Sequence, residues 1–230
     1  MTARNIKNRP LLNVHAILPL SHANGPGARA VVWVQGCRRK CPGCCNPQTH
    51  SHGHRHLIDP QNLARAILAI PGIEGLTVSG GEPFEQAEAV GVLCRKVREN
   101  GLSVMVFTGR THERIRASRG QAVQDLLAQI DILVDGPFIQ ELADNHLIWR
   151  GSRNQRVLFL SNRHDPEVLD RGTPTAVEAR LALGSPLGVT GFPEGSDVQF
   201  LAKCLRLKSG ILLEPLPTEK SNTRARRRNP

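Results

Sequence analysis

The feature that most constrains this chain is a group of four cysteines within nine residues, at Cys37, Cys41, Cys44 and Cys45. Three of them follow the pattern C-x3-C-x2-C. Three close thiolates without a regular fourth predict an iron–sulfur cluster held through three of its four irons. Zinc is the alternative, although structural zinc sites usually combine two C-x2-C pairs or a mixture of Cys and His. The spacing alone leaves both metals open.

The composition indicates the kind of protein that carries this group. Hydrophobic residues make up 40% of the 230 residues, which is enough for one domain with a real core. No apolar run approaches the ~20 residues that cross a bilayer. Six cysteines could form three disulfides, but the adjacency of Cys44 and Cys45 and the tight clustering favour metal ligation in a reducing compartment. We therefore expect a cytoplasmic protein.

Two polar segments each have two interpretations. Histidines alternate at 50, 52, 54 and 56, so an extended segment would place them on one face, where they could bind zinc, copper or nickel. A flexible surface loop explains the same residues. The arginine-rich tail at 216–230 lacks apolar periodicity, which predicts disorder. It could contact nucleic acid or an acidic partner, or it could simply solubilise the chain.

Strands and helices alternate along the first 160 residues. Apolar strands are predicted at 31–34, 76–78, 103–107, 132–134 and 157–160, and 11–20 is interpreted as a first strand or entry segment. Amphipathic helices are predicted after Asp59, at 83–100 and around 123–130, with Cys94 as a buried core thiol. This alternation predicts an α/β fold with a parallel sheet and right-handed crossovers. It is short of a full eight-fold barrel, which takes ~250 residues.

The pattern changes after residue 160. Residues 176–183 and 187–190 predict an antiparallel hairpin, and a helix at 197–206 would follow, carrying Cys204. We therefore expect a core at 1–160, a C-terminal extension at 161–215 packed on that core, and a disordered basic tail at 216–230.

Several motifs carry a resemblance to known enzymes. The cysteine pattern after one strand and Ser79-Gly-Gly-Glu-Pro83 after a second resemble the radical S-adenosylmethionine superfamily. Asn24-Gly-Pro-Gly27 resembles the glycyl-radical-enzyme activases. The segments 134–138 and 147–155 are similar to the activating enzymes of anaerobic ribonucleotide reductases. The resemblance runs from about residue 12 to about residue 160, and it implies an open, partial parallel β/α barrel.

The resemblance also implies cofactors and a set of contacts. Cys37, Cys41 and Cys44 would hold a [4Fe-4S] cluster, and the fourth iron would bind S-adenosylmethionine. Glycines permit close backbone approach, and an acid accepts charged hydrogen bonds from the methionine ammonium group. The implied cofactor contacts are Gly80, Gly81, Glu82, Thr108, Asp135, Arg150, Ser152 and Asn154, and the implied substrate loop contains Asn24, Gly25 and Gly27. Ordinary turn and helix-start roles would also explain Glu82 and Asp135.

The resemblance implies an enzyme that cleaves S-adenosylmethionine to a 5′-deoxyadenosyl radical and generates a glycyl radical on a partner enzyme. The electron would come from a flavodoxin or a ferredoxin. One alternative keeps the radical chemistry but modifies a peptide or a small molecule. Another is a zinc-stabilised nucleic-acid-binding protein that uses the basic tail. Cys45 stands where close relatives usually carry an aromatic residue, which leaves the packing of the adenine undetermined.

Overall fold

The computed structural model describes residues 10–171 and two short strands, β8 (Glu178–Arg180) and β9 (Gly188–Thr190). These strands pair in antiparallel fashion, which confirms the expected hairpin for the residues described. The expected helix at 197–206, Cys204 and the tail at 216–230 lie outside the described residues, as does most of the expected extension at 161–215.

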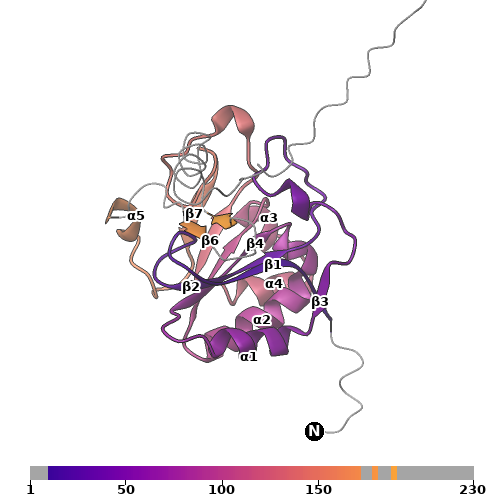
Figure 1. Ribbon diagram of the computed structural model, residues 1–230. Helices are drawn as coiled ribbons and strands as arrows, with labels where there is room; N and C mark the ends of the chain where they lie inside the picture. The colour runs from indigo at the N-terminus through magenta and orange to yellow at the C-terminus, as the bar shows by residue number, and fades with distance from the viewer. Residues whose placement is uncertain (1–9, 172–177, 181–187, 191–230) are drawn as a thin grey trace, which may run out of the picture.

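A seven-stranded sheet forms the centre of the molecule, in the order β3-β1-β2-β4-β5-β6-β7 (Figure 1). The four central strands β2, β4, β5 and β6 are parallel, whereas β1, β3 and β7 run antiparallel to their neighbours. The sheet does not close on itself. The strands are β1 (Leu12–Ser21), β2 (Arg29–Val34), β3 (His56–Ile58), β4 (Gly75–Gly80), β5 (Ser103–Phe107), β6 (Ile132–Asp135) and β7 (Arg156–Phe159).

The prediction of a parallel sheet is confirmed for the central strands and is wrong at the edges. The loop at 22–28 between β1 and β2 is too short for a parallel crossover, which takes a dozen or more residues. At the other edge, Arg156 of β7 pairs with Asp135, the last residue of β6, so the chain returns directly beside the strand that it has just left. The α/β class is therefore confirmed, and the sheet is mixed and open.

Three helices cover one face of the sheet, α1 (Pro60–Leu68), α2 (Ala87–Glu99) and α4 (Gln121–Leu127) (Figure 1). α1 begins as predicted, because the Asp59 carboxylate accepts the N–H groups of Gln61 and Asn62 at 2.8 and 3.1 Å. Cys94 of α2 is buried in this core, as predicted. The shorter helices are η2 (Pro47–Thr49), η3 (Pro83–Gln86), α3 (His112–Arg116), η4 (Gln140–Leu142) and α5 (Val168–Arg171). Among the helices described, none is both long and apolar enough to span a membrane.

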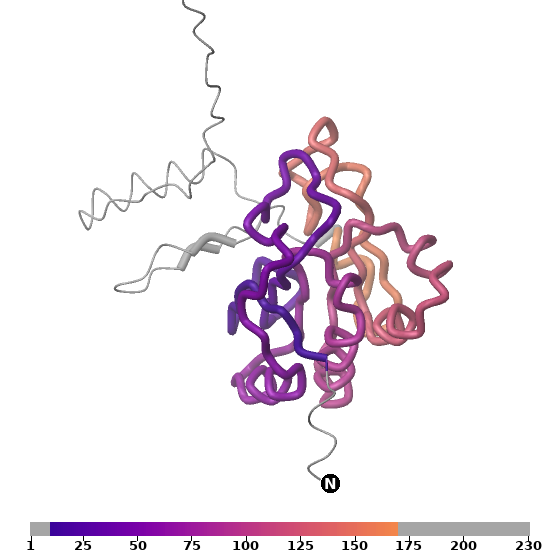
Figure 2. The backbone as a smooth tube through the Cα atoms, turned by 90° about the vertical axis from the view of Figure 1, so that its right-hand side faces the viewer, coloured from indigo at the N-terminus to yellow at the C-terminus, as the bar shows by residue number. Residues whose placement is uncertain are grey.

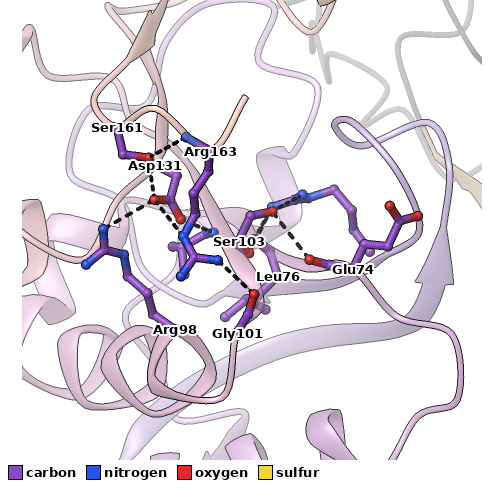
Figure 3. Close-up of polar contacts among 10 residues, drawn as sticks. Glu74, Leu76, Arg98, Gly101, Ser103, Asp131, Ser161 and Arg163 are labelled. Atoms are coloured by element: carbon purple, nitrogen blue, oxygen red, sulfur yellow. Dashed lines mark hydrogen bonds and ion pairs between the residues drawn. The ribbon is translucent and has the colours of Figure 1, made fainter. Parts of the chain in front are cut away.

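A buried carboxylate fixes the amino ends of the parallel strands (Figure 3). Asp131, directly before β6, accepts hydrogen bonds from the Val104 N–H at 2.9 Å and from the Ser161 hydroxyl at 2.6 Å. The guanidinium groups of Arg98 and Arg163 lie 3.4 and 3.6 Å from the same carboxylate. Because a buried charge must be paired and hydrogen-bonded, this network ties α2, β5, β6 and the segment after β7 together.

Candidate metal centre

The three motif cysteines lie on one loop, residues 36–50, called the cysteine loop below. It begins directly after the carboxyl end of the parallel strand β2. Two backbone hydrogen bonds close its base, from residue 36 to residue 49 at 2.7 Å and from residue 37 to residue 50 at 3.2 Å. The Cys44 N–H donates to the Cys41 carbonyl at 3.2 Å, which forms the turn between these ligand candidates. The thiols of Cys37, Cys41 and Cys44 are partly exposed and unbridged.

The cysteine loop rests on the glycine turn that follows β4. The Gly81 N–H donates to the Val34 carbonyl at 2.8 Å, and the Glu82 N–H donates to the Gly36 carbonyl at 2.9 Å. A Cβ on Gly81 would lie 2.2 Å from the Gly36 oxygen, and Gly80 has a φ of +98°. Only glycine fits both positions, so the two predicted motifs are in direct backbone contact.

The cysteine loop also extends across the ends of β5 and β6. The Arg39 side chain lies against Gly109, where an added Cβ would be 2.5 Å from the Arg39 Nε. Gly43 lies against Phe138 and Gln140, with distances from its added Cβ of 3.2 and 3.0 Å. In Figure 2 the purple cysteine loop and the salmon segment after β6 rise side by side at the top of the view. The cysteines therefore lie at the carboxyl ends of the parallel strands, as predicted.

Glu82 is buried and joins two of these strand ends. Its Oε1 accepts hydrogen bonds from the Phe84 N–H at 3.1 Å and the Thr108 hydroxyl at 2.8 Å, and its Oε2 accepts the Gly109 N–H at 3.0 Å. Burial raises the pKa of Glu82. Three of about four acceptor positions are thus used within the protein, and one on Oε2 remains. The structure brings Gly80, Glu82 and Thr108 together beside the cysteine loop.

Asp135, at the end of β6, has partners within the protein. The His112 N–H donates to its Oδ2 at 2.7 Å, and the Arg156 Nε donates to its Oδ1 at 2.9 Å. Arg156 also bonds Glu113 at 2.9 and 3.0 Å. Asp135 therefore anchors α3 and β7, which is the turn and helix-start role that the sequence left open.

The predicted residues Arg150, Ser152 and Asn154 lie together in the segment before β7. The buried Ser152 hydroxyl accepts the Ile139 N–H at 3.3 Å, and Arg150 donates to carbonyls of its own segment at 3.4 Å. The Asn154 Nδ2 donates to the Pro137 carbonyl at 2.7 Å. Its Oδ1 is buried and has no hydrogen-bond partner among the residues described. This amide oxygen is the unmatched polar atom of the segment.

The predicted substrate loop is not beside the cysteines. Residues 24–27 precede β2 and so lie at the amino ends of the parallel strands. The Asn24 carbonyl accepts the Thr77 hydroxyl at 2.7 Å. Thr77 is three residues before the end of β4, so at about 3.3 Å per residue this contact is about 10 Å from the glycine turn. Gly25 lies against Met105, because an added Cβ would be 2.7 Å from the Met105 sulfur.

A fully buried arginine holds this loop in place. Arg29 donates to the Pro26 carbonyl at 3.1 Å, the Thr77 hydroxyl at 2.8 Å and the Leu76 carbonyl at 2.8 Å. It also donates to the hydroxyl and the carbonyl of Ser103 at 2.8 and 3.2 Å. Burial lowers the pKa of Arg29 to about 10. Arg29 therefore has a structural role under the loop.

The cysteines differ in their chemistry. A hydrogen bond from the Cys45 thiol, helped by the Asn46 N–H and His50, lowers the pKa of Cys44 to about 5. The same contact raises the pKa of Cys45 well above its ordinary value. Burial raises the pKa of Cys37. These donors therefore favour the thiolate form of Cys44, which is the form that binds metals.

The donor set consists of three cysteine thiols on one loop, which are the ligands that iron–sulfur clusters take. Within the described part of the chain, no three Cys, His, Asp or Glu side chains converge as one metal ion would require. A cluster spreads its three thiolates over three irons, so its ligands need not converge on one point. The alternating histidines do not converge either, because His52 pairs with Glu85 at 2.8 Å, and His54 and His56 are exposed.

Two residues at this end were not predicted from the sequence. The Gln86 amide donates to the carbonyls of Asn13 and Gln35 at 3.0 and 2.9 Å and accepts the Asn13 N–H at 2.8 Å, which joins η3 to β1 and β2. Arg156, the partner of Asp135, is the second. Their partners lie far away in the sequence, and no local spacing marks such long-range pairs.

The comparison with known proteins agrees with this arrangement. Residues 23–158 match the family described as "4Fe-4S single cluster domain". The chain is similar to the anaerobic ribonucleoside-triphosphate reductase-activating protein of Vibrio cholerae, with 40% identity over 152 residues that cover 63% of this chain and 96% of that protein. The proteins of the same description from Escherichia coli (strain K12) and Enterobacteria phage T4 are 34% and 32% identical, over 65% and 64% of this chain and 99% and 93% of theirs.

The family match extends from before β2 into β7, so it includes the cysteine loop, the glycine turn and the ends of all four parallel strands. An iron–sulfur cluster is therefore supported over zinc as the group that the cysteines hold. The chain belongs to the family of anaerobic ribonucleoside-triphosphate reductase-activating proteins, with a 4Fe-4S single cluster domain at residues 23–158.

Proposed function

We propose that this chain is a radical S-adenosylmethionine enzyme that installs a glycyl radical on a partner such as an anaerobic ribonucleotide reductase. One observation supports this most: the cysteine loop and the Gly80–Glu82 turn are in direct backbone contact in a member of the activating-protein family. When bound, the [4Fe-4S] cluster and S-adenosylmethionine would together supply a 5′-deoxyadenosyl radical. The protein supplies position and exclusion of water.

The cysteine loop would hold the cluster. Cys37, Cys41 and Cys44 would each bind one iron as a thiolate. The hydrogen-bond donors around Cys44 lower its pKa and so favour the thiolate that would bind iron. Cys45 would stabilise this thiolate by donating a hydrogen bond, which is a supporting role that differs from ligation.

The glycine turn would hold S-adenosylmethionine. The free acceptor position on the Glu82 Oε2 and the carbonyls of Gly80 and Gly81 suit the methionine ammonium group. Thr108 would act through Glu82, whose oxygen it bonds. The buried Oδ1 of Asn154 is an acceptor suited to a ribose hydroxyl, and the guanidinium group of Arg150 suits a carboxylate.

The enzyme would need two protein partners, the reductase and an electron donor. The open sheet would act as a partial barrel that admits a protein loop beside the cysteine loop. Residues 24–27, at the amino ends of the strands, would contact the partner away from the cysteines. A flavodoxin or ferredoxin would supply the electron, and the reducing cytoplasm would keep the thiols available. Asp135 would act indirectly by positioning β7.

A matched pair of variants tests the cluster and its chemistry. Iron and sulfide are counted after anaerobic reconstitution, and 5′-deoxyadenosine is quantified by mass spectrometry after adding dithionite and S-adenosylmethionine. Cys44→Ala should lose the cluster and the product, whereas Cys45→Ala should keep both. Full iron loading in Cys44→Ala would contradict the assignment of the ligands. A loaded protein that forms no 5′-deoxyadenosine would contradict the proposed chemistry.

A further inference from the structure

The cysteine loop carries an uncompensated positive charge. Residues 1–58 contain eight Lys or Arg and no Asp or Glu, and the first acidic residue of the chain is Asp59. Three of the cations, Arg38, Arg39 and Lys40, form a run between the ligand cysteines 37 and 41. All three side chains are exposed. A surface of one sign raises the local concentration of oppositely charged partners and speeds their association.

The acids near this run do not neutralise it. Glu82 is buried and bonded to Thr108. Glu85 accepts the backbone N–H of Arg38 at 3.0 Å, and its second oxygen bonds His52 at 2.8 Å. The hydrogen bond from His52 and the nearby charges lower the pKa of Glu85 against the opposing effect of burial. Residues 36–58 therefore carry four exposed cations, the run and Arg55, while one partly buried carboxylate, Glu85, bonds the backbone of the run.

The run lies close to the ligand cysteines, which determines where a partner that binds it must lie. Each of the three cations is at most two residues from a ligand cysteine, which is at most about 7–8 Å of chain. A partner that binds these side chains therefore lies beside the cluster. Electron transfer between proteins falls steeply with distance, so this is where a donor must dock.

The backbone of the run is held in a defined conformation. Lys40 has a φ of +47°, which is uncommon for a residue with a side chain and is a conformation that surrounding structure must enforce. The Arg39 side chain packs against Gly109, where an added Cβ would be 2.5 Å from the Arg39 Nε. The charges are therefore presented on a supported loop, which lowers the entropy lost when a partner orders them.

We propose that Arg38, Arg39 and Lys40 form the docking surface for an acidic one-electron donor protein. This rests on the proposed function, because it assumes a cluster at the cysteines. The donor docks with its acidic face on the run and passes one electron to the cluster, which changes from the 2+ to the 1+ state. The donor is oxidised by one electron, and no bond forms or breaks. Salt screens exposed charges, so the association is sensitive to ionic strength.

The test compares two triple variants of the reconstituted protein. Arg38→Gln/Arg39→Gln/Lys40→Gln removes the run. Arg65→Gln/Arg95→Gln/Lys96→Gln removes the same charge from exposed positions on α1 and α2.

An acidic flavodoxin is the probe. Its binding is measured by calorimetry at low and high salt, and the rate of cluster reduction by its reduced form is followed by stopped-flow absorbance. Photoreduced deazaflavin, a small neutral reductant, provides the reference rate, and the midpoint potential of each cluster is measured.

The run variant should bind the donor at least tenfold more weakly at low salt and lose most of the salt dependence. The rate at which reduced flavodoxin reduces the cluster of this variant, divided by the rate with deazaflavin, should fall by a similar factor. The α1/α2 variant should behave as the unmodified protein does.

Equal losses in both variants would overturn the proposal, because they would show that only net charge matters. Unchanged donor binding would also overturn it. If the run variant keeps donor binding but no longer activates the reductase, the surface belongs to the reductase and the proposal is wrong. If the unmodified protein assembles no cluster, the proposed function fails first and this proposal falls with it, which iron counting distinguishes from a docking failure.

Discussion

Replacing Arg29 by Met should destabilise the protein by about 3 kcal/mol, although the change removes a buried charge. Arg29 is fully buried and donates five hydrogen bonds, three of them to the main-chain carbonyls of Pro26, Leu76 and Ser103. Met has a similar length and cannot donate, so these carbonyls would stay buried without this donor.

Two opposing terms set the magnitude. A buried acceptor that loses its donor costs roughly 1–3 kcal/mol, so three carbonyls cost about 6 kcal/mol at the middle of that range. Burial lowers the pKa of Arg29 from its ordinary value to about 10, and at about 1.4 kcal/mol per pKa unit the ionised group costs roughly 3 kcal/mol at neutral pH. Removing the charge regains that cost. The loss of hydrogen bonds exceeds the gain, which leaves a net destabilisation of about 3 kcal/mol.

Urea unfolding of the metal-free protein, followed by tryptophan fluorescence, measures this difference as a shift of the midpoint at constant slope. Arg65→Met is the control, because Arg65 is exposed on α1 and its replacement should change the free energy of unfolding by no more than about 0.5 kcal/mol. An Arg29→Met protein as stable as the unmodified one would refute the reasoning, since the carbonyls would then have found other donors.

Two further predictions follow from single contacts. Gly81→Ala should destabilise the protein by about 1–3 kcal/mol and reduce iron loading, because its Cβ would lie 2.2 Å from the Gly36 carbonyl. Gly91→Ala on α2 is the control in the same urea and iron assays, because its added Cβ would lie at an ordinary 3.7 Å from its neighbours. If Gly91→Ala lost as much stability and iron as Gly81→Ala, the steric explanation would be contradicted. Cys94 is buried and its pKa is raised by burial, so iodoacetamide should spare it in the native metal-free protein. The same reagent should modify the partly exposed Cys44, whose pKa is lowered, and mass spectrometry that finds Cys94 modified as fast as Cys44 would show that the core opens.

The sequence was sufficient for features that depend on local pattern. Short apolar runs predicted the four central strands, and Asp59 followed by proline predicted the start of α1. The order of the motifs, each directly after a strand, placed the cysteines and Glu82 at the same end of the sheet. These predictions succeeded because the carboxyl ends of parallel strands share one edge.

Features that depend on partners distant in the sequence could not be predicted. The antiparallel course of β7 follows from pairing with β6, and nothing in its own residues distinguishes it from a parallel strand. Asp135 bonds Arg156, 21 residues away, and no local spacing indicates this pair. The loop at 24–27 lies at the opposite end of β2 from the cysteines, because it precedes this strand and the cysteines follow it.

Electron paramagnetic resonance tests the central claim most directly. The reconstituted and reduced protein is mixed with S-adenosylmethionine and an anaerobic ribonucleotide reductase under strictly anaerobic conditions, and the sample is frozen. The account predicts a persistent glycyl doublet on the reductase, together with 5′-deoxyadenosine, and neither signal with the Cys44→Ala protein. Formation of 5′-deoxyadenosine without any radical on the reductase, while a peptide or small molecule is altered instead, would contradict it.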